Sequence, residues 1–232
     1  MAFQGYTQQT VDFMWGIRFN NERGWFMAHK DEYISTFLTP TKELGEQVYD
    51  AMHALLPDEP LILKVSRIYR DARRLFGRGP YKDHLWWCIR TGDKDWTGRP
   101  TFWFELGPDY YSFGLGFWSP AAALMETFRK QLDQHPQELE KLVRQFNKQK
   151  VFTLDGPEYA RSKGQTSDLL RPWYQKKSLS LRWEGPLDER IFFPALAEDI
   201  IEGFKTLIPF YHYFNKIVAL TPQQERTRGQ DA

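Results

Sequence analysis

Apolar residues recur at helical spacing over the first quarter of the chain. Over residues 7–19 they fall on one helical face, which predicts an amphipathic helix. The same spacing predicts a second helix over residues 22–37 and a third that opens at Pro40, because proline suits the first helical turn. Two prolines in residues 57–60 end this helical part.

From Leu61 to Tyr69 the pattern alternates with a period of two. This alternation predicts a strand that places Arg67 and Tyr69 on one face. Three further strand-like runs follow, at residues 83–90, 101–107 and 110–117. Because glycine, aspartate and proline turns separate them, an antiparallel meander is the simplest arrangement.

Helical patterns return in the second half of the chain. Ser119-Pro120 is typical of a helix cap followed by proline in the first turn, and Pro136 predicts the start of another helix. A strand is predicted over residues 173–183, followed by helices near 188–206 and 209–219.

These elements predict one α+β domain over residues 1–220, in which helical layers pack on a central, mainly antiparallel sheet. No internal repeat or Ser/Gly linker divides residues 7–219. Residues 221–232 have almost no apolar content, so we predict a disordered C-terminal tail.

Composition narrows the class of protein. The 232 residues are 41% hydrophobic and 16% aromatic, which suffices for a packed core. A formal net charge of +1 argues against a protein that coats nucleic acid or an anionic membrane through its overall field. No apolar run is long enough to span a bilayer, and the first ten residues lack a signal core. With one cysteine, Cys88, the chain is expected to be cytoplasmic.

Positive charge is concentrated just after the first predicted strand. Six cationic residues and one carboxylate give this stretch an excess of five charges (six minus one), and they are Arg67, Arg70, Arg73, Arg74, Arg78 and Lys82 against Asp71. In a nearly neutral protein such a concentration marks the first candidate site.

Several motifs along the chain form one pattern. They are Asn20-Asn21 with Trp25-Phe26, Arg67-Ile68-Tyr69-Arg70-Asp71 with Arg73, Pro80-Tyr81-Lys82 with His84, the Gly114–Pro120 segment, and Lys177–Leu181. Together they resemble the uncharacterised family catalogued as domain of unknown function 2461. The resemblance implies a mixed α+β fold and brings no established activity.

One loop departs from that family pattern. Where the family has phenylalanine and serine after its arginine, this chain has Arg74-Leu75, and where the family has aspartate and lysine it has Gly77-Arg78. The departure removes a carboxylate and makes the loop more cationic. A partner that depends on that aspartate is therefore expected to differ.

The cationic stretch has two interpretations. In the first, Arg70 and Arg73 offer bidentate donors to a small anionic or phosphorylated ligand, Lys82 adds a point charge and Tyr81 donates a hydrogen bond. Arg67 and Asp71 belong to the same candidate ligand site. In the second, these charges form a structural ion-pair network in a noncatalytic interaction or scaffold protein.

Other polar and aromatic residues are weaker candidates. Asn21 and Trp25 are candidate ligand-cleft residues, although asparagines between helices and aromatics at helical spacing are usually caps and core. Trp118, near two glycines, is a third. His84 is the best candidate for a general base, because it follows Lys82 closely and an imidazole titrates near neutral pH, but a hydrogen-bonding role explains it equally.

Metal and cofactor classes find no support in the sequence. The five histidines form no ligand-spaced pairs, and there is no phosphate loop, dinucleotide fingerprint or catalytic-serine elbow. We therefore predict neither a metal nor a cofactor. The neighbouring Trp86 and Trp87 must face opposite sides of a strand, which argues against a stacking surface for nucleic acid. A small anionic ligand is the partner we expect, and protein partners stay open.

Overall fold

The N-terminal quarter of the chain is helical. The structure is a computed structural model that describes residues 2–71, 73, 75, 77–92 and 95–222. The N-terminal elements are α1 (Gln8–Phe19), α2 (Arg23–Ala28), α3 (Lys30–Glu32), a π-helix (Tyr33–Leu38) and α4 (Thr39–Leu55). The helix predicted to open at Pro40 is α4, which begins one residue earlier and directly continues the π-helix. The widened turn of the π-helix accommodates a proline that lacks a backbone donor.

The central sheet has six strands in the described part of the chain. They are β1 (Leu61–Val65), β2 (Leu85–Thr91), β3 (Pro100–Leu106), β4 (Tyr110–Phe117), β5 (Thr153–Asp155) and β6 (Ser180–Pro186). Their order is β1-β2-β3-β4-β6-β5, and every neighbouring pair is antiparallel. The predicted α+β class and the meander of the first four strands are confirmed.

β1 is shorter than the alternation predicted. It ends at Val65, and beyond it a single bridge joins Tyr69 to Tyr81. The Trp86 backbone N–H donates to Ser66 Oγ over 3.0 Å, so a side chain replaces the carbonyl that would have continued the ladder. Arg67 therefore lies in the connection that follows β1.

The remaining helices cover the ends and one face of the sheet. They are α5 (Ala122–Gln134), α6 (Pro136–Phe146), α7 (Arg171–Tyr174) and α8 (Ala195–Leu220), with 3₁₀ turns at Trp96–Gly98 and Glu189–Phe192. The predicted start at Pro136 is confirmed. α8 is one helix where two were predicted, because its buried apolar face holds it together across the interior Pro209. The strand predicted over residues 173–183 holds the end of α7 and the beginning of β6. Of the predicted tail, residues 223–232 lie outside the described part.

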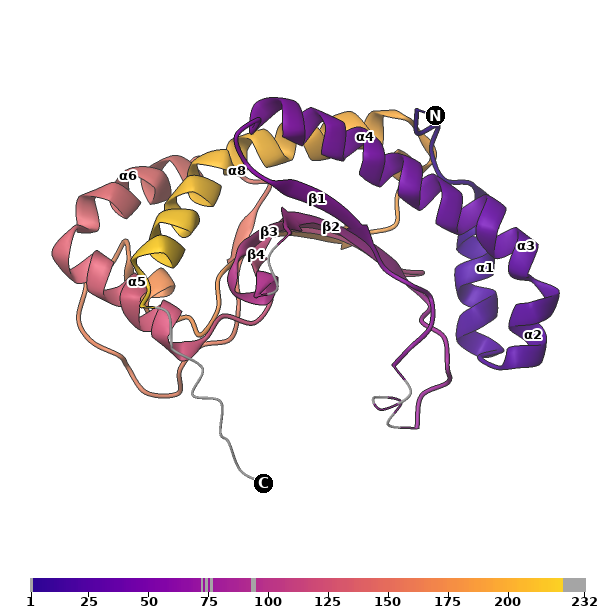
Figure 1. The fold of residues 1–232 in the computed structure, drawn as a ribbon, viewed down its shortest axis with the longest axis horizontal. Coiled ribbons are helices and arrows are strands. Elements are labelled where there is room, and N and C mark those ends of the chain that lie inside the picture. Colours follow the sequence, from indigo (N-terminus) through magenta and orange to yellow (C-terminus); the bar gives the residue numbers. More distant parts are fainter. Residues whose placement is uncertain (1, 72, 74, 76, 93–94, 223–232) are drawn as a thin grey trace, which may run out of the picture.

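The two faces of the sheet differ in what covers them. Figure 1 shows the sheet as an arch, with α4 and α8 over its convex side and its concave side left open. On the convex side Phe204 of α8 contacts the rings of Trp87, Phe102 and Phe113, at centroid distances of 6.3, 4.9 and 6.1 Å. α4 approaches just as closely, since a Cβ on Gly45 would lie 3.3 Å from Trp87. The convex face is thus core, and the concave face is available for function.

No helix in the described residues has the length and apolar character needed to cross a bilayer.

Candidate functional site

An aromatic cleft occupies the concave face of the sheet. Strand register places Trp86 opposite Glu105, which pairs with Ser112, and Cys88 opposite Trp103. Because side chains alternate along a strand, these residues all project from the face that α4 and α8 leave open. The cleft has a volume of about 260 Å³, and its lining includes Trp86, Trp96, Trp103, Trp118, Glu105, Ser112 and Arg182.

A cationic hollow adjoins this cleft at Trp86. It has a volume of about 440 Å³ and is formed by the end of β1, the following connection and the start of β2. The charged residues in its lining are Lys64, Arg67, Arg70, Asp71, Arg78 and Lys82. Trp86 lines both spaces, so the hollow and the cleft adjoin at this residue.

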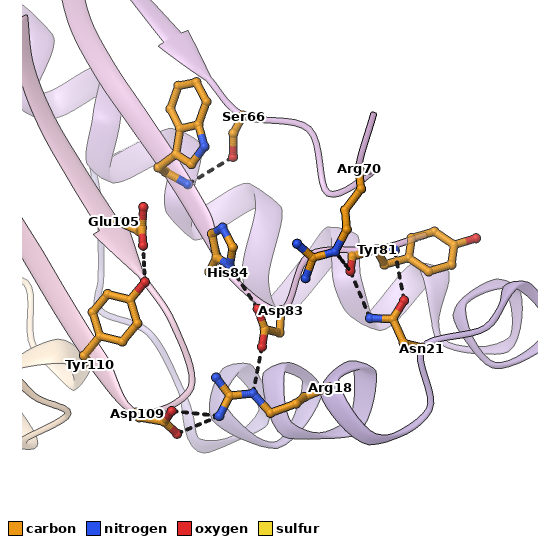
Figure 2. A network of polar contacts seen from close by, with 11 residues as sticks. Arg18, Asn21, Ser66, Arg70, Tyr81, Asp83, His84, Glu105, Asp109 and Tyr110 are labelled. Carbon is orange, nitrogen blue, oxygen red and sulfur yellow. Dashed lines mark hydrogen bonds and ion pairs between the residues drawn. The ribbon is translucent and has the colours of Figure 1, made fainter. Parts of the chain in front are cut away.

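Local strand pairing positions Arg70 and Lys82. Arg70 N donates to Pro80 O over 2.8 Å and Lys82 N donates to Ile68 O over 2.7 Å, on either side of the Tyr69–Tyr81 bridge. The guanidinium of Arg70 is fixed further, because its Nε donates to Tyr81 O over 2.8 Å (Figure 2). Its two terminal nitrogens make no hydrogen bond within the described residues, and burial lowers the pKa of Arg70 while Asp83 opposes that shift.

Lys82 is half-buried between the hollow and the cleft. Its ammonium lies 5.6 Å from the centre of the Trp86 ring and makes no hydrogen bond or ion pair with the described residues. Burial lowers the pKa of Lys82 to about 8; the charges of Arg70 and Arg67 add to this effect and that of Glu105 opposes it. A substantial share of this side chain can therefore lose its proton under mildly alkaline conditions.

A chain of ion pairs lies next to Lys82. Figure 2 shows Asp83 between His84 and Arg18: Asp83 Oδ1 is 2.9 Å from His84 Nδ1, and Arg18 Nε donates to Asp83 Oδ2 over 2.7 Å. Arg18 also reaches both carboxylate oxygens of Asp109. The hydrogen bond with His84, helped by Arg18 and opposed by burial, holds the pKa of Asp83 well below its usual range. The network ties α1 to the beginning of β2 and to the turn between β3 and β4.

Glu105 is also engaged on the concave face. The hydroxyl of Tyr110 donates to Glu105 Oε1, as Figure 2 shows. Burial raises the pKa of Tyr110 strongly, and the hydrogen bond and charge of Glu105 add to that effect, so the phenol keeps its proton. Tyr110 thus fixes the position of the carboxylate whose charge opposes the pKa shift of Lys82.

The structure separates the predicted ligand residues into groups. Arg67, Arg70, Asp71 and Lys82 line the cationic hollow together. Trp118 lies on the cleft, 71% exposed and 6.4 Å from Trp86 between ring centres.

Arg73 lies outside the lining of the hollow. It is exposed, and its Nη2 pairs with Asp71 Oδ2 over 2.8 Å. Its part in ligand binding stays a prediction.

Asn21 and Tyr81 support the segment that carries Arg70 and Lys82, whereas Trp25 lies outside the lining of the hollow. Asn21 Nδ2 donates to Tyr81 O and Tyr81 N donates to Asn21 Oδ1, both over 2.9 Å. The Tyr81 ring is buried and stacks on Phe26, and Figure 2 shows it directed away from His84. Trp25 stacks on His29 with ring centres 3.9 Å apart. The hydrogen bonds of Asn21 fix the backbone that carries Lys82, and Trp25 packs instead against Gly16 of α1.

Some polar residues of the site belong to no motif that can be recognised in the sequence. Arg18, Asp83 and Asp109 are distant in sequence, and Ser112 and Arg182 meet in the cleft through strand pairing. The signal that could have found Ser112 is its register opposite Glu105, which requires the order of the strands. His84 is half-buried with one nitrogen held by Asp83, and its role as a general base stays a prediction.

A metal centre finds no support in the described ranges, where no group of three or more His, Cys, Asp or Glu side chains is placed to hold a metal ion.

Two comparisons with known proteins bear on this chain. The model of a protein family described as a conserved hypothetical protein (DUF2461) matches residues 9–213. No curated protein matches the chain. The matched range includes every element that forms the cationic hollow and the aromatic cleft.

Proposed function

The chain belongs to this family of conserved hypothetical proteins, and we propose that it binds a small anionic or phosphorylated ligand in the cationic hollow. One observation carries the proposal. Arg67, Arg70 and Lys82 line the same open hollow, and their terminal nitrogens make no hydrogen bond or ion pair with any of the described residues. Guanidinium and ammonium groups in this state are suited to phosphate, sulfate or carboxylate oxygens.

The balance of charge supports an anion. In the described part of the lining, five side chains are cationic, namely Lys64, Arg67, Arg70, Arg78 and Lys82, and Asp71 alone is anionic. Asp71 is paired with Arg73. The carboxylates whose charges act on Arg70 and Lys82 are also engaged, since Asp83 is held by Arg18 and His84 and Glu105 by Tyr110. An incoming anion therefore meets the positive charges of Arg67, Arg70 and Lys82, which no bonded carboxylate of the described residues neutralises.

The alternative is that the cationic motif is structural and that the protein is a noncatalytic interaction or scaffold protein. The pair between Arg73 and Asp71 and the bond from Arg70 to Tyr81 O favour this interpretation for part of the motif. It does not account for Lys82, which is half-buried without a bonded partner among the described residues. Lys82 is therefore the residue on which the two hypotheses differ most.

Isothermal titration calorimetry with inorganic phosphate and with sulfate tests the proposal. Lys82→Met removes the charge and keeps the length of the side chain, and Arg70→Lys keeps the charge but removes the bidentate fork. A charge-assisted hydrogen bond is worth about 1.5–3 kcal/mol, so each variant is expected to weaken binding about tenfold or more.

Arg144→Gln is the matched control. It removes an exposed arginine that pairs with Glu140 on α6 and lies outside the lining of the hollow, and we expect anion affinity to stay within about twofold of wild type. Thermal unfolding of each variant checks that the fold is intact. The proposal fails if wild type gives no anion-dependent heat, or if folded Lys82→Met and Arg70→Lys bind the anion as tightly as wild type.

A further inference from the structure

The aromatic cleft next to the cationic hollow has the features of a second part of a ligand site. Four tryptophans line it, and Trp118 is 71% exposed although its ring is large and apolar. The rings of Trp86 and Trp118 face one another at 6.4 Å between centres, with 32° between their planes. Open aromatic walls that approach in this way are suited to a planar ring, and a small outward rotation of exposed Trp118 lets a ring enter.

The cleft also holds polar atoms that lack partners. Ser112 is 1% exposed, and its Oγ makes no hydrogen bond within the described part of the chain. Arg182 Nε is likewise buried without a partner, although its terminal nitrogens pair with Asp155 and Glu184. Buried polar groups are rarely left unpaired, so a ligand with hydrogen-bonding atoms on its ring would satisfy both. A purely hydrocarbon ligand would leave them unsatisfied.

The cleft is large enough to hold a ring, and it lies close enough to Lys82 for one molecule to occupy both spaces. A cavity of about 150 Å³ is enough to hold benzene, so the 260 Å³ cleft has room for a ring with polar substituents or for two fused rings. Trp86 lines both spaces, and the Lys82 ammonium lies 5.6 Å from its ring centre. An anion at Lys82 and a ring beside Trp86 can therefore belong to one molecule with a linker of a few bonds.

We propose that the ligand is a small phosphorylated compound with a planar heteroaromatic ring, the chemistry of a nucleoside monophosphate, whose ring lies in the aromatic cleft. This inference rests on the proposed anion site, which takes the phosphate. Trp86 and Trp118 contact the faces of the ring, and Ser112 Oγ and Arg182 Nε bind its heteroatoms. The nearly neutral net charge of the chain favours a small ligand over a nucleic-acid chain.

Calorimetry with matched ligands tests the ring and the anion separately. The probes are the four common nucleoside 5′-monophosphates, ribose 5-phosphate with the same charge but no ring, and inorganic phosphate. We expect at least one nucleoside monophosphate to bind about tenfold or more tightly than ribose 5-phosphate, because one stacked base contributes an effect of that size.

Two variants test whether the aromatic cleft causes the preference for a nucleoside monophosphate over ribose 5-phosphate. Trp118→Ala removes an exposed wall and is expected to abolish most of the preference for the nucleotide, while ribose 5-phosphate and phosphate bind as in wild type. Phe193→Ala, which removes a 55% exposed aromatic side chain outside the cleft lining, is the control and should keep the preference.

The outcomes separate the two proposals. If phosphate and ribose 5-phosphate bind but no nucleotide binds more tightly, the ring inference is overturned and the anion site stands. If neither phosphate nor any phosphorylated probe binds, the anion site itself is wrong. A single-stranded oligonucleotide that binds far more tightly than every monophosphate would overturn the small-ligand assignment in favour of a nucleic-acid surface.

Discussion

The affinity of the cationic hollow for an anion should depend on the protonation of Lys82. Burial lowers the pKa of this lysine to about 8, from an ordinary value of 10.5. An anion in contact with the ammonium replaces the lost solvation and favours the charged form, so the pKa of Lys82 in the complex is expected to return toward its ordinary value. Binding is then linked to the uptake of a proton above pH 8.

The size of the effect follows from these two values. At pH 7, one unit below the pKa of the free site, about 91% of Lys82 is protonated, and at pH 9, one unit above it, about 9% is protonated. If Lys82 in the complex stays protonated at both values, the dissociation constant should rise about tenfold from pH 7 to pH 9. Affinity is thus nearly full at pH 7 and falls as the pH rises through 8.

Calorimetric titration with sulfate at pH 7, 8 and 9 measures this dependence, because sulfate, unlike phosphate, keeps its charge over the whole range. Lys82→Arg is the sharpest comparison, since a guanidinium stays charged at pH 9 and should make the affinity almost independent of pH. Titration in two buffers of different ionisation enthalpy should reveal proton uptake by wild type at pH 9. Equal affinity of wild type at pH 7 and 9, or the same tenfold fall in Lys82→Arg, would refute the reasoning.

Two further predictions concern the residues that hold the site in place. Asp83→Asn should lower the free energy of unfolding by about 2 kcal/mol at pH 7, because Arg18 and His84 lose a charged partner. Since the pKa of Asp83 is lowered in the folded state, its stabilisation is fully present above its unfolded pKa of about 3.8 and is lost progressively as the pH falls from there toward the folded pKa, so the difference between wild type and variant in denaturant titrations should shrink steadily below pH 3.8. Asn21→Ala removes both hydrogen bonds to the Tyr81 backbone and should weaken sulfate binding several-fold by loosening the segment before Lys82; unchanged affinity in the folded variant would show that this clamp does not position the ammonium.

Secondary structure was predictable where local periodicity and packing agree. The first helix and the four-strand meander follow from patterns that span a whole element. Prediction was wrong where tertiary contacts override a local signal. Two helices were predicted near residues 188–206 and 209–219, but α8 continues through Pro209 because its apolar face is buried along its length. β1 stops early because Ser66 takes the hydrogen bond of Trp86, a contact between positions 20 residues apart.

The candidate site was predictable only in part. Clustering of arginine and lysine in the sequence located the cationic hollow, since Arg67, Arg70 and Lys82 lie close along the chain. It could not distinguish Arg73, whose charge is paired with Asp71, from Lys82, whose charge is not paired among the described residues. The aromatic cleft required the order and register of four strands, because no short segment contains more than two of its tryptophans.

The arrangement of the sheet explains why function is expected on one side of it. α4 and α8 bury the convex face completely enough that Trp87, Phe102 and Phe104 have no exposed surface. The same strands present charged and aromatic side chains on the concave face. Packing of the core does not require these side chains, and a charged group that is buried there without a partner costs free energy.

The Arg18–Asp83–Asp109 network is consistent with a structural role, because each charge in it is met by another. Lys82, Ser112 and Arg182 Nε differ from it in having groups without hydrogen-bond partners in the described structure. Because those groups line adjoining spaces that meet at Trp86, a single ligand with an anionic and an aromatic part accounts for all three.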